Sequence, residues 1–233
     1  MSLKQGWREA KNSFLDLLFP PRCAGCGRSG SWLCPACISE IEFIEPPLCS
    51  RCGLPSVESP CLSCRIDPLA IDGIRGVGYL RGPLKRAVYQ FKYRQKRKLA
   101  LPLADLMHHY LSENPLPAEL IVPVPLHLDR LRERGYNQAA LLARGLSERS
   151  GLPIEEESLV RIKETAPQVA LKADERRKNV RGAFRGQDEN LRDRQVLLID
   201  DVCTTGATLE ACAEALHEKG ARSVWALVLA RET

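Results

Sequence analysis

The chain lacks any apolar run of the ~18–20 residues that a membrane-spanning helix requires. The N-terminal apolar run Phe14–Phe19 is short, contains Asp16 and has no small-residue cleavage site, so we expect no secretory signal. The chain also has neither the G-x-G-x-x-G of dinucleotide-binding folds nor the G-K-[ST] of P-loop nucleotide triphosphatases. We therefore expect a cytoplasmic protein without membrane insertion, whose site belongs to neither of these nucleotide-binding classes.

The chain is rich in cysteine, and most of its cysteines are clustered in one short stretch. Its 233 residues suffice for one α/β domain and a small module, and eight of the ten cysteines lie in that module's span. A C-x-x-C pair places two thiolates on one side of a tight turn, at a spacing suited to Zn–S bonds of ~2.3 Å. In a reducing compartment such pairs favour metal over disulfides. The four pairs are Cys23/Cys26, Cys34/Cys37, Cys49/Cys52 and Cys61/Cys64.

Four such pairs predict two structural zinc sites with four cysteine ligands each, and the alternatives are an iron–sulfur cluster or a redox dithiol. Sequential pairing would combine the first two pairs in one site and the last two in the other, but the spacing also permits a cross-braced arrangement. The module has few large apolar residues, so metal binding would supply its folding energy. A zinc site closed by four cysteines leaves no open position for catalysis.

The stretch Val196–Thr208 carries the strongest functional signal. Val196–Ile199 is apolar, as in a parallel strand buried on both faces, and Asp200 and Asp201 stand where it would end. A small turn follows, and then an apolar-periodic helix through about Lys219. The turn residues expected to hold a phosphate are Thr204, Thr205, Gly206, Ala207 and Thr208. Carboxylates accept hydrogen bonds from vicinal hydroxyls, and backbone N–H groups at a helix N-terminus bind a phosphate.

This stretch resembles the motif that binds 5-phosphoribosyl-1-pyrophosphate (PRPP) in type I phosphoribosyltransferases. The alternative is an ordinary turn after a strand with an acidic end. In the purine-specific enzymes an Asp that contacts the base follows the acid pair, whereas this chain has Thr204 there. The resemblance therefore implies PRPP binding, with Mg²⁺ accompanying PRPP, and argues against purine salvage.

A second strand, loop and helix precede this motif. Leu120–Val124 is apolar and continues into a loop, and a helix is expected at Ala139–Ser150. The unit resembles the corresponding part of amidophosphoribosyltransferases, where the loop after the strand holds pyrophosphate. By that resemblance the pyrophosphate residues are Leu126, His127, Arg130 and Arg134. His127 is either catalytic or a hydrogen-bonded structural residue.

A long polar and basic stretch, Leu159–Phe184, shows no sustained core pattern in its middle. It resembles the mobile catalytic loop of the same enzymes, with Lys163 and Arg177 in matching surroundings. The alternative is an exposed connection. Loops of this length in compact domains usually bind ligands or close over them.

The remaining elements follow from apolar periodicity. We expect an edge strand at Ile74–Leu80, helices at Pro83–Tyr93 and Leu99–Leu111, and a final strand at Ser223–Ala230. Cys212 lies on an apolar helix face and is expected in the core. Cys203 lies within the phosphate-binding turn and is expected to be exposed.

Positive charge concentrates between Arg81 and Lys98, a span without a single acidic residue, in a chain of net charge +5. We expect these cations on the outer face of one helix and in the turn after it. Tyr89 and Tyr93 interleave with them, as in proteins that bind single-stranded nucleic acid. The alternative is a solvated surface. The candidate nucleic-acid residues are Lys85, Arg86, Lys92, Arg94, Lys96, Arg97 and Lys98.

The order of these features resembles the ComF family of bacterial competence proteins, also called the GntX group. The resemblance implies a type I phosphoribosyltransferase fold, with a parallel sheet of about five strands, flanking helices and a small hood. It implies a double zinc-ribbon module with a short N-terminal helix at residues 1–66 and a phosphoribosyltransferase-like domain at 67–233. It further implies a role in DNA uptake, with single-stranded DNA and a competence helicase as partners.

Three hypotheses of function remain open on these grounds. The chain is an active phosphoribosyltransferase with an unknown acceptor, in which Asp200, Asp201, Lys163 and Arg177 are the catalytic residues. Alternatively, it binds PRPP without turnover, or it is an adaptor that binds nucleic acid. Pyrophosphate release, stabilisation by Mg·PRPP, and salt-dependent strand binding distinguish the three.

Overall fold

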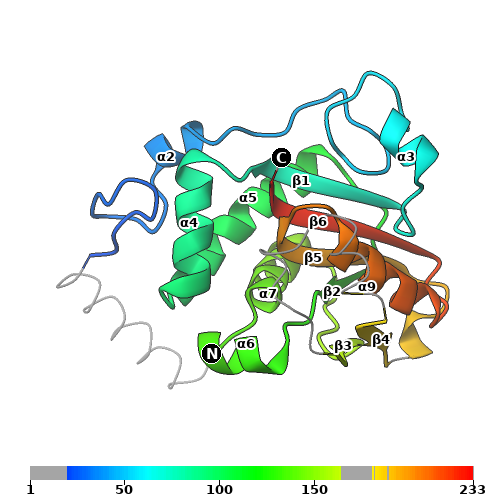
Figure 1. The fold of residues 1–233 in the computed structure, drawn as a ribbon. Helices are drawn as coiled ribbons and strands as arrows, with labels where there is room; N and C mark the ends of the chain where they lie inside the picture. The colour runs from blue at the N-terminus through cyan, green and yellow to red at the C-terminus, as the bar shows by residue number, and fades with distance from the viewer. Residues whose placement is uncertain (1–19, 164–179, 181, 188, 233) are drawn as a thin grey trace.

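A four-stranded parallel sheet forms the centre of the molecule in the computed structural model, which describes residues 20–163, 180, 182–187 and 189–232 (Figure 1). The strand order is β1-β6-β5-β2. The strands are β1 (Gly73–Tyr79), β2 (Leu120–Pro123), β5 (Gln195–Cys203) and β6 (Ser223–Arg231). About five strands were expected; in the described residues the place beside β2 is taken by a single parallel bridge between Ile121 and Ile154.

Strands β5 and β6 are central because their side chains are apolar on both faces. The expected edge strand is confirmed as β1, and the final strand pairs on both sides instead of closing an edge. Strand β5 continues beyond Ile199 through both acids to Cys203, further than the sequence indicated. It does so because its second half stays paired with β6, in register from Asp200 opposite Val228 to Cys203 opposite Arg231.

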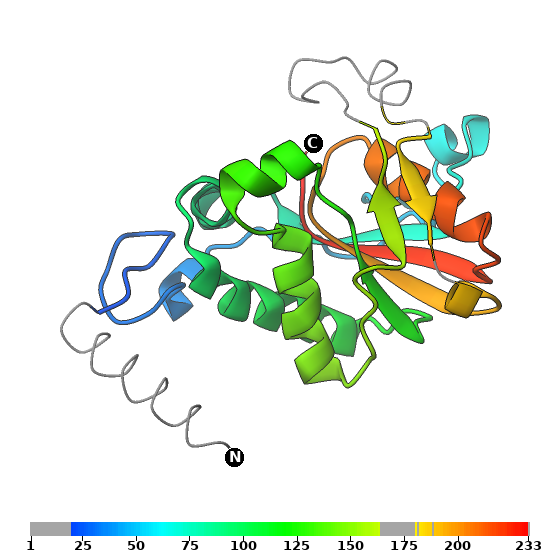
Figure 2. The ribbon, with the colours of Figure 1, turned by 90° about the horizontal axis from the view of Figure 1, so that it is seen from below.

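Helices cover both faces of the sheet (Figure 2). One face packs against α4 (Gly82–Tyr93), α5 (Ala100–Glu113) and α7 (Gln138–Ser150), with a 3-10 turn, η1 (Arg97–Leu99), between the first two. Phe91 of α4 is fully buried in this layer, as the pattern predicted. The three helices confirm the expected positions to within two residues at each end.

The opposite face carries α9 (Ala207–His217) and a short antiparallel hairpin of β3 (Leu159–Arg161) and β4 (Phe184–Gly186). Cys212 of α9 is fully buried there, which confirms the prediction. A short helix, α6 (Leu128–Arg134), follows β2, and a 3-10 turn, η3 (Glu189–Leu191), precedes β5. The expected parallel sheet with flanking helices is therefore confirmed.

The cysteine module lies along the outer edge of β1 (Figure 1). Its helices are α2 (Pro35–Ser39) and α3 (Leu62–Ile66). Between them, Phe43 bridges Gly78 in antiparallel fashion, and the Ile44 N–H donates to the carbonyl of Val77 at 3.1 Å. This linker covers hydrogen-bonding groups that an edge strand would otherwise expose. The module is thus attached to the sheet along its edge.

None of the helices in the described parts of the chain combines the length and the apolar character that crossing a membrane requires.

Candidate functional site

A cavity of about 420 Å³ opens at the carboxyl ends of β2 and β5. Ligands of parallel α/β sheets bind at this edge because the strand-to-helix loops gather there. The lining brings together the acid pair, the threonine turn and the loop after β2, which lie far apart in the sequence. We call it the acid-pair cavity. Its charged lining residues are Lys85, Lys92, Arg130, Arg134, Arg161, Asp200, Asp201 and Glu232.

The two acids of the cavity face opposite sides of β5, because neighbouring side chains of a strand alternate. Asp201 is buried and forms an ion pair with Lys92 of α4, with Nζ 2.8 Å from Oδ1. The side chains of Lys92 and Asp201 are 19% and 8% exposed. The pair engages one carboxylate oxygen and lies in the wall of the cavity, so it does not fill the space between the acids and the turn.

Asp200 is half-buried and accepts a hydrogen bond from the Asp201 N–H at 2.8 Å. Burial raises the pKa of Asp200 to about 7, and the neighbouring Asp201 charge raises it further, against the opposing effect of Lys92. A carboxyl group with a pKa in this range changes charge near neutral pH. It can accept a hydrogen bond from a ribose hydroxyl as a carboxylate, or release a proton.

The threonine turn connects β5 to α9. Gly206 has a φ of +89° and lies at the N-cap of α9, a backbone conformation that favours glycine. Thr204 and Thr208 line the acid-pair cavity, whereas Thr205 accepts a hydrogen bond from the Ala207 N–H at 3.4 Å and shapes the turn. The turn thus presents two hydroxyl groups and the N-terminus of an eleven-residue helix to the cavity.

Cys203 is buried rather than exposed, which contradicts the sequence-based expectation. It forms the last pair in the register of β5 with β6, and its thiol accepts a hydrogen bond from Arg231 Nη1 at 2.6 Å. Burial raises the pKa of this thiol to about 11, so it is not a nucleophile at neutral pH.

The loop after β2 faces the acids across the cavity. Leu126, Arg130 and Arg134 line it, but the segment expected to be loop becomes helical at Leu128, where α6 begins. Arg134 Nη1 donates to Gln138 at 3.1 Å, and its guanidinium lies over the ring of Tyr93 at 5.0 Å. Arg130 makes no ion pair within the described residues. Both arginines are therefore available to an anion.

The remaining predicted catalytic residues lie elsewhere. His127 caps α6, accepting the Asp129 N–H at Nδ1 over 3.3 Å, and it is not among the residues that line the acid-pair cavity. Lys163 follows β3, is exposed, and lies beside Gly182. Arg177 lies outside the described residues.

Two cations in the cavity were missed or misplaced by sequence reasoning. Lys92 was expected on the outer face of its helix, but it points inward to Asp201. Its spacing of four from the buried Val88 was the available signal, since residues four apart share a helix face. Arg161 of β3 was overlooked because the sequence of its segment resembles a polar loop. Its pKa is lowered mainly by burial and further by the like charge of Arg130.

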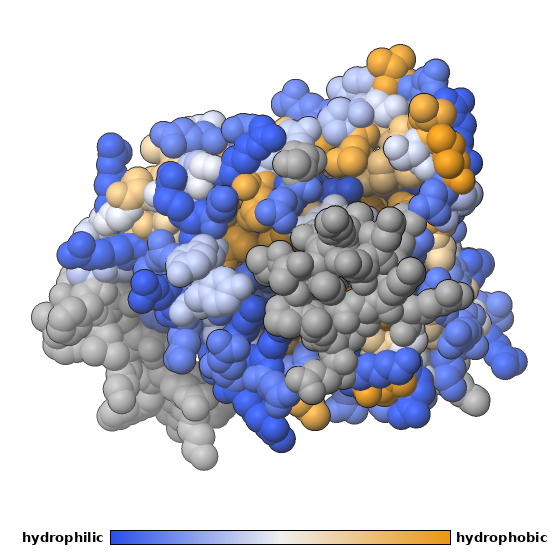
Figure 3. Space-filling view, in the orientation of Figure 1, coloured by the Kyte–Doolittle hydropathy of each residue, from blue (hydrophilic) through white to orange (hydrophobic). Residues whose placement is uncertain are grey.

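The rest of the basic segment lies on α4 and the turn after it. Arg86 Nε donates to the carbonyl of Gly25, Arg97 donates to that of Gly135 at 2.7 Å, and Lys98 lies over the Trp32 ring at 5.7 Å. Lys85 and Arg94 form no ion pair within the described residues. Hydrophilic atoms dominate the surface over α4, whereas apolar atoms gather over α3 (Figure 3).

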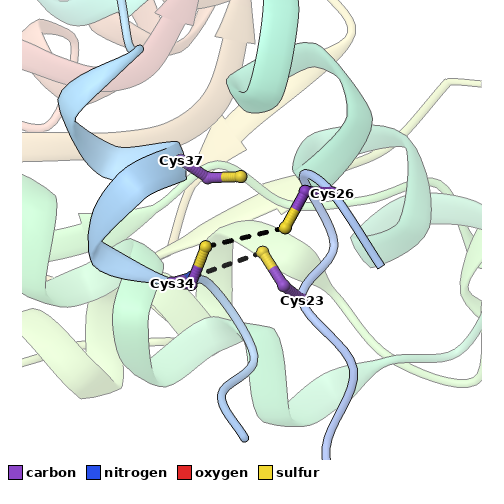
Figure 4. Close-up of side chains that lie close together, drawn as sticks. All are labelled: Cys23, Cys26, Cys34 and Cys37. Carbon is purple, nitrogen blue, oxygen red and sulfur yellow. Dashed lines mark hydrogen bonds between the residues drawn. The ribbon is translucent and has the colours of Figure 1, made fainter. Parts of the chain in front are cut away.

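The eight clustered cysteines form two groups of four, Cys23/Cys26/Cys34/Cys37 and Cys49/Cys52/Cys61/Cys64. Within each group all ligand atoms lie within 4.8 Å of one another. This is the sequential pairing, not the cross-braced one. In the first group, one pair comes from a loop and the other from the start of α2, and the four thiols converge (Figure 4).

The geometry of both groups fits zinc. A tetrahedron with Zn–S bonds of ~2.3 Å has edges of about 3.8 Å. The Sγ atoms of Cys26 and Cys34 lie 3.7 Å apart, and those of Cys52 and Cys61 lie 3.8 Å apart. Burial opposes ionisation of Cys23, but backbone N–H groups of Cys34, Cys26 and Gly25 outweigh it and lower its pKa to about 6. Around Cys49, backbone N–H groups of Cys61, Cys52 and Arg51 likewise outweigh burial and lower the pKa of this thiol to about 6. Each site therefore contains one thiol that ionises more easily than a free cysteine.

Comparison with known proteins agrees with this architecture. Residues 14–66 match the family model described as a double zinc ribbon domain. Residues 98–233, more than half of the chain, match the family model of the phosphoribosyl transferase domain. The two cysteine groups are therefore the zinc sites of a double zinc ribbon.

Curated relatives combine the same parts. The chain is 31% identical over 210 residues to the DNA utilization protein YhgH of Escherichia coli (strain K12), covering 87% of this chain and 92% of the relative. It is 32% identical over 212 residues to competence protein F of Haemophilus influenzae, with coverages of 85% and 90%. It is 31% identical over 208 residues to competence protein ComFC of Bacillus subtilis, with coverages of 85% and 84%. The chain belongs to the ComF family of proteins with a double zinc ribbon and a phosphoribosyltransferase domain.

Proposed function

We propose that the acid-pair cavity binds PRPP and that α4 binds single-stranded DNA, in a protein that serves the use of incoming DNA. The observation that carries the first part is that one cavity is lined by the acid pair, by Thr204 and Thr208 of the turn, and by three arginines. The names of the relatives, DNA utilization protein and competence protein, support the second part. The cytoplasmic location, the helicase partner and the domain boundary at residue 66 stay predictions.

The charges of the cavity match the parts of PRPP. Thr204, Thr208 and the N-terminus of α9 suit the 5-phosphate, because threonine hydroxyls and backbone N–H groups at a helix N-terminus can donate to its oxygens. Asp200 and Asp201 suit the vicinal ribose hydroxyls. Across the cavity, Arg130 and Arg134 suit the pyrophosphate, to which a guanidinium can donate two parallel hydrogen bonds.

Mg²⁺ would enter this site together with PRPP. Within the described residues, no third acid or histidine joins Asp200 and Asp201 to form a metal-binding group. Mg²⁺ commonly uses one or two carboxylates together with substrate phosphates and water. Asp200 would be the carboxylate nearer to the metal, since Lys92 engages an oxygen of Asp201.

If PRPP is turned over, the residues of the cavity supply orientation and charge neutralisation. Departure of pyrophosphate from the ribosyl carbon builds positive charge on the sugar and negative charge on the leaving group. The acid pair faces the sugar, and Arg130 and Arg134 face the leaving group. Lys163 is not among the residues that line the cavity, and the catalytic role of Arg177, outside the described residues, stays a prediction.

Thermal unfolding with Mg·PRPP tests the binding. At a PRPP concentration 100-fold above its Kd, a ligand of the native state adds about 2.7 kcal/mol of stability, which raises the Tm by roughly 5–10 °C. We expect this shift in the wild type and in Glu113→Gln, which removes an exposed carboxylate at the end of α5. The double variant Asp200→Asn/Asp201→Asn should show no shift. An equal shift in the double variant would disprove binding at the acid pair.

A further inference from the structure

A second cavity adjoins the acid-pair cavity. It is open, measures about 730 Å³, and is lined by α4 and the turn after it, where Arg86 and Gln90 bond to carbonyls of the first zinc ribbon. We call it the ribbon-side cavity; its lining residues are Lys85, Arg86, Tyr89, Gln90, Arg94 and Lys96. Lys85 and Tyr89 line both cavities. These two residues are four apart on α4, so they stand together on one helix face at the junction.

The ribbon-side cavity has the chemistry of a site for a phosphate backbone. Among the described residues that line it, four are cations and none is an acid. Tyr89 is 53% exposed, and its ring centre lies 5.1 Å from that of Tyr93, which is 52% exposed and lines the acid-pair cavity. Exposed aromatic rings beside cations stack the bases of a single strand and bind its phosphates.

Two lining side chains of this cavity are anchored to the first zinc ribbon. Gln90 Nε2 donates to the carbonyl of Ala24 at 2.8 Å, and Arg86 Nε donates to that of Gly25. Gln90 in turn accepts from Lys96 Nζ at 2.5 Å. Arg86 and Lys96 are therefore held in place before a ligand arrives, which reduces the entropy lost on binding.

We propose that single-stranded DNA in the ribbon-side cavity and PRPP in the acid-pair cavity compete for Lys85 and Tyr89, so that each ligand weakens the other. This inference rests on the proposed function. One ammonium group at the junction cannot neutralise both polyanions, and two anions that share a lining residue repel each other, since charges interact over ~8 Å at physiological salt. The coupling is reciprocal, because binding free energies are linked. PRPP thereby favours release of the strand.

Two titrations of the zinc-loaded full chain measure the coupling. Fluorescence anisotropy gives the Kd of a labelled oligothymidylate with and without saturating Mg·PRPP, and calorimetry gives the Kd of Mg·PRPP with and without the unlabelled oligonucleotide. Each ligand should raise the Kd of the other by the same factor, about tenfold. Magnesium chloride with sodium chloride at equal ionic strength controls for the effect of salt on the strand.

Variants locate the coupling. Lys85→Met should bring the factor close to one, because it removes the shared cation. Arg28→Ala removes an exposed positive charge outside both cavities and should keep the tenfold factor. If both ligands bind and neither changes the Kd of the other, or if they tighten each other, the competition is wrong and the proposed function stands. If Mg·PRPP does not bind at all, the proposed function fails and the competition falls with it.

Discussion

The ion pair between Lys92 and Asp201 yields the sharpest test of the site, because it joins α4 to the acid pair. Lys92→Met keeps much of the side-chain volume and removes the charge. Asp201, 8% exposed, is then left as a buried carboxylate next to a second acid without its cation. Removal of one partner of a buried pair costs about 3–5 kcal/mol.

Because Lys92 keeps 19% of its side chain exposed, water replaces part of its effect, and we expect a loss of about 3 kcal/mol. At this chain size 1 kcal/mol corresponds to about 2–4 °C, so the Tm should fall by roughly 9 °C. Chemical denaturation at pH 8 measures the free energy of unfolding. Lys92→Arg keeps the charge and should lose far less. Lys85→Met, a lysine on the same helix without an ion pair in the described residues, should stay within ~0.5 kcal/mol of the wild type.

A double-mutant cycle separates the pair from other effects of the substitution. Asp201→Asn in the Lys92→Met background removes the unpaired charge and should restore part of the loss. We expect a coupling energy above ~1.5 kcal/mol between the two positions. If the two substitutions add to within ~0.5 kcal/mol, the contact does not stabilise the fold, and Asp201 needs another explanation for its burial.

Three further predictions concern charge, backbone and metal. The pKa of Asp200 is raised to about 7, so the stability that this carboxyl group contributes is complete below its unfolded pKa and is lost as pH rises through 7. The Tm of Asp200→Asn should therefore exceed that of the wild type by an amount that grows from pH 5 to pH 8, and a constant difference would contradict the raised pKa. Gly53→Ala places a Cβ 2.0 Å from a backbone carbonyl oxygen of β1 and should lower the free energy of unfolding by more than ~2 kcal/mol in a denaturant titration. Gly27→Ala, at a similar positive φ but with open space around the Cβ, should lower it by about 1 kcal/mol, and equal losses would show that the second ribbon is not in close contact with the strand. Elemental analysis should find about two zinc ions per chain and about one in Cys34→Ser or in Cys61→Ser; loss of both ions from either variant would mean that the sites are not independent.

Sequence reasoning predicted those parts of the site whose residues are close together in the sequence. The apolar strand, the acid pair and the threonine turn are neighbours in the chain, so local rules place them at the end of β5 and the start of α9. Cysteine spacing likewise predicted the ligands of two zinc sites. It left their pairing open because spacing restricts the distance within a C-x-x-C pair and says little about which pairs meet.

The parts that it missed depend on contacts between distant segments. Nothing near Lys92 in the sequence carries negative charge, so the basic run resembled one exposed face, whereas the sheet brings Asp201 beneath it. Cys203 was expected to be exposed because β5 was taken to end at Ile199. Only the register of β6 shows that the strand continues and that Arg231 covers the thiol.

Helix α4 connects the features that the sequence presents as separate. Its buried face packs on the sheet through Phe91, its Lys92 reaches the acid pair, and its Arg86 and Gln90 bond to carbonyls of the first zinc ribbon. A Cβ at Gly25 would lie 2.5 Å from Cys37 Sγ and 3.2 Å from Pro83 of α4, so ribbon and helix touch where the metal is bound. Metal binding therefore acts on more than the folding of the ribbon, because it positions the helix whose other faces line both cavities. Substitution of a ligand in the first zinc site should disturb strand binding, while the second site, which packs on β1, has no such path to α4 within the described residues.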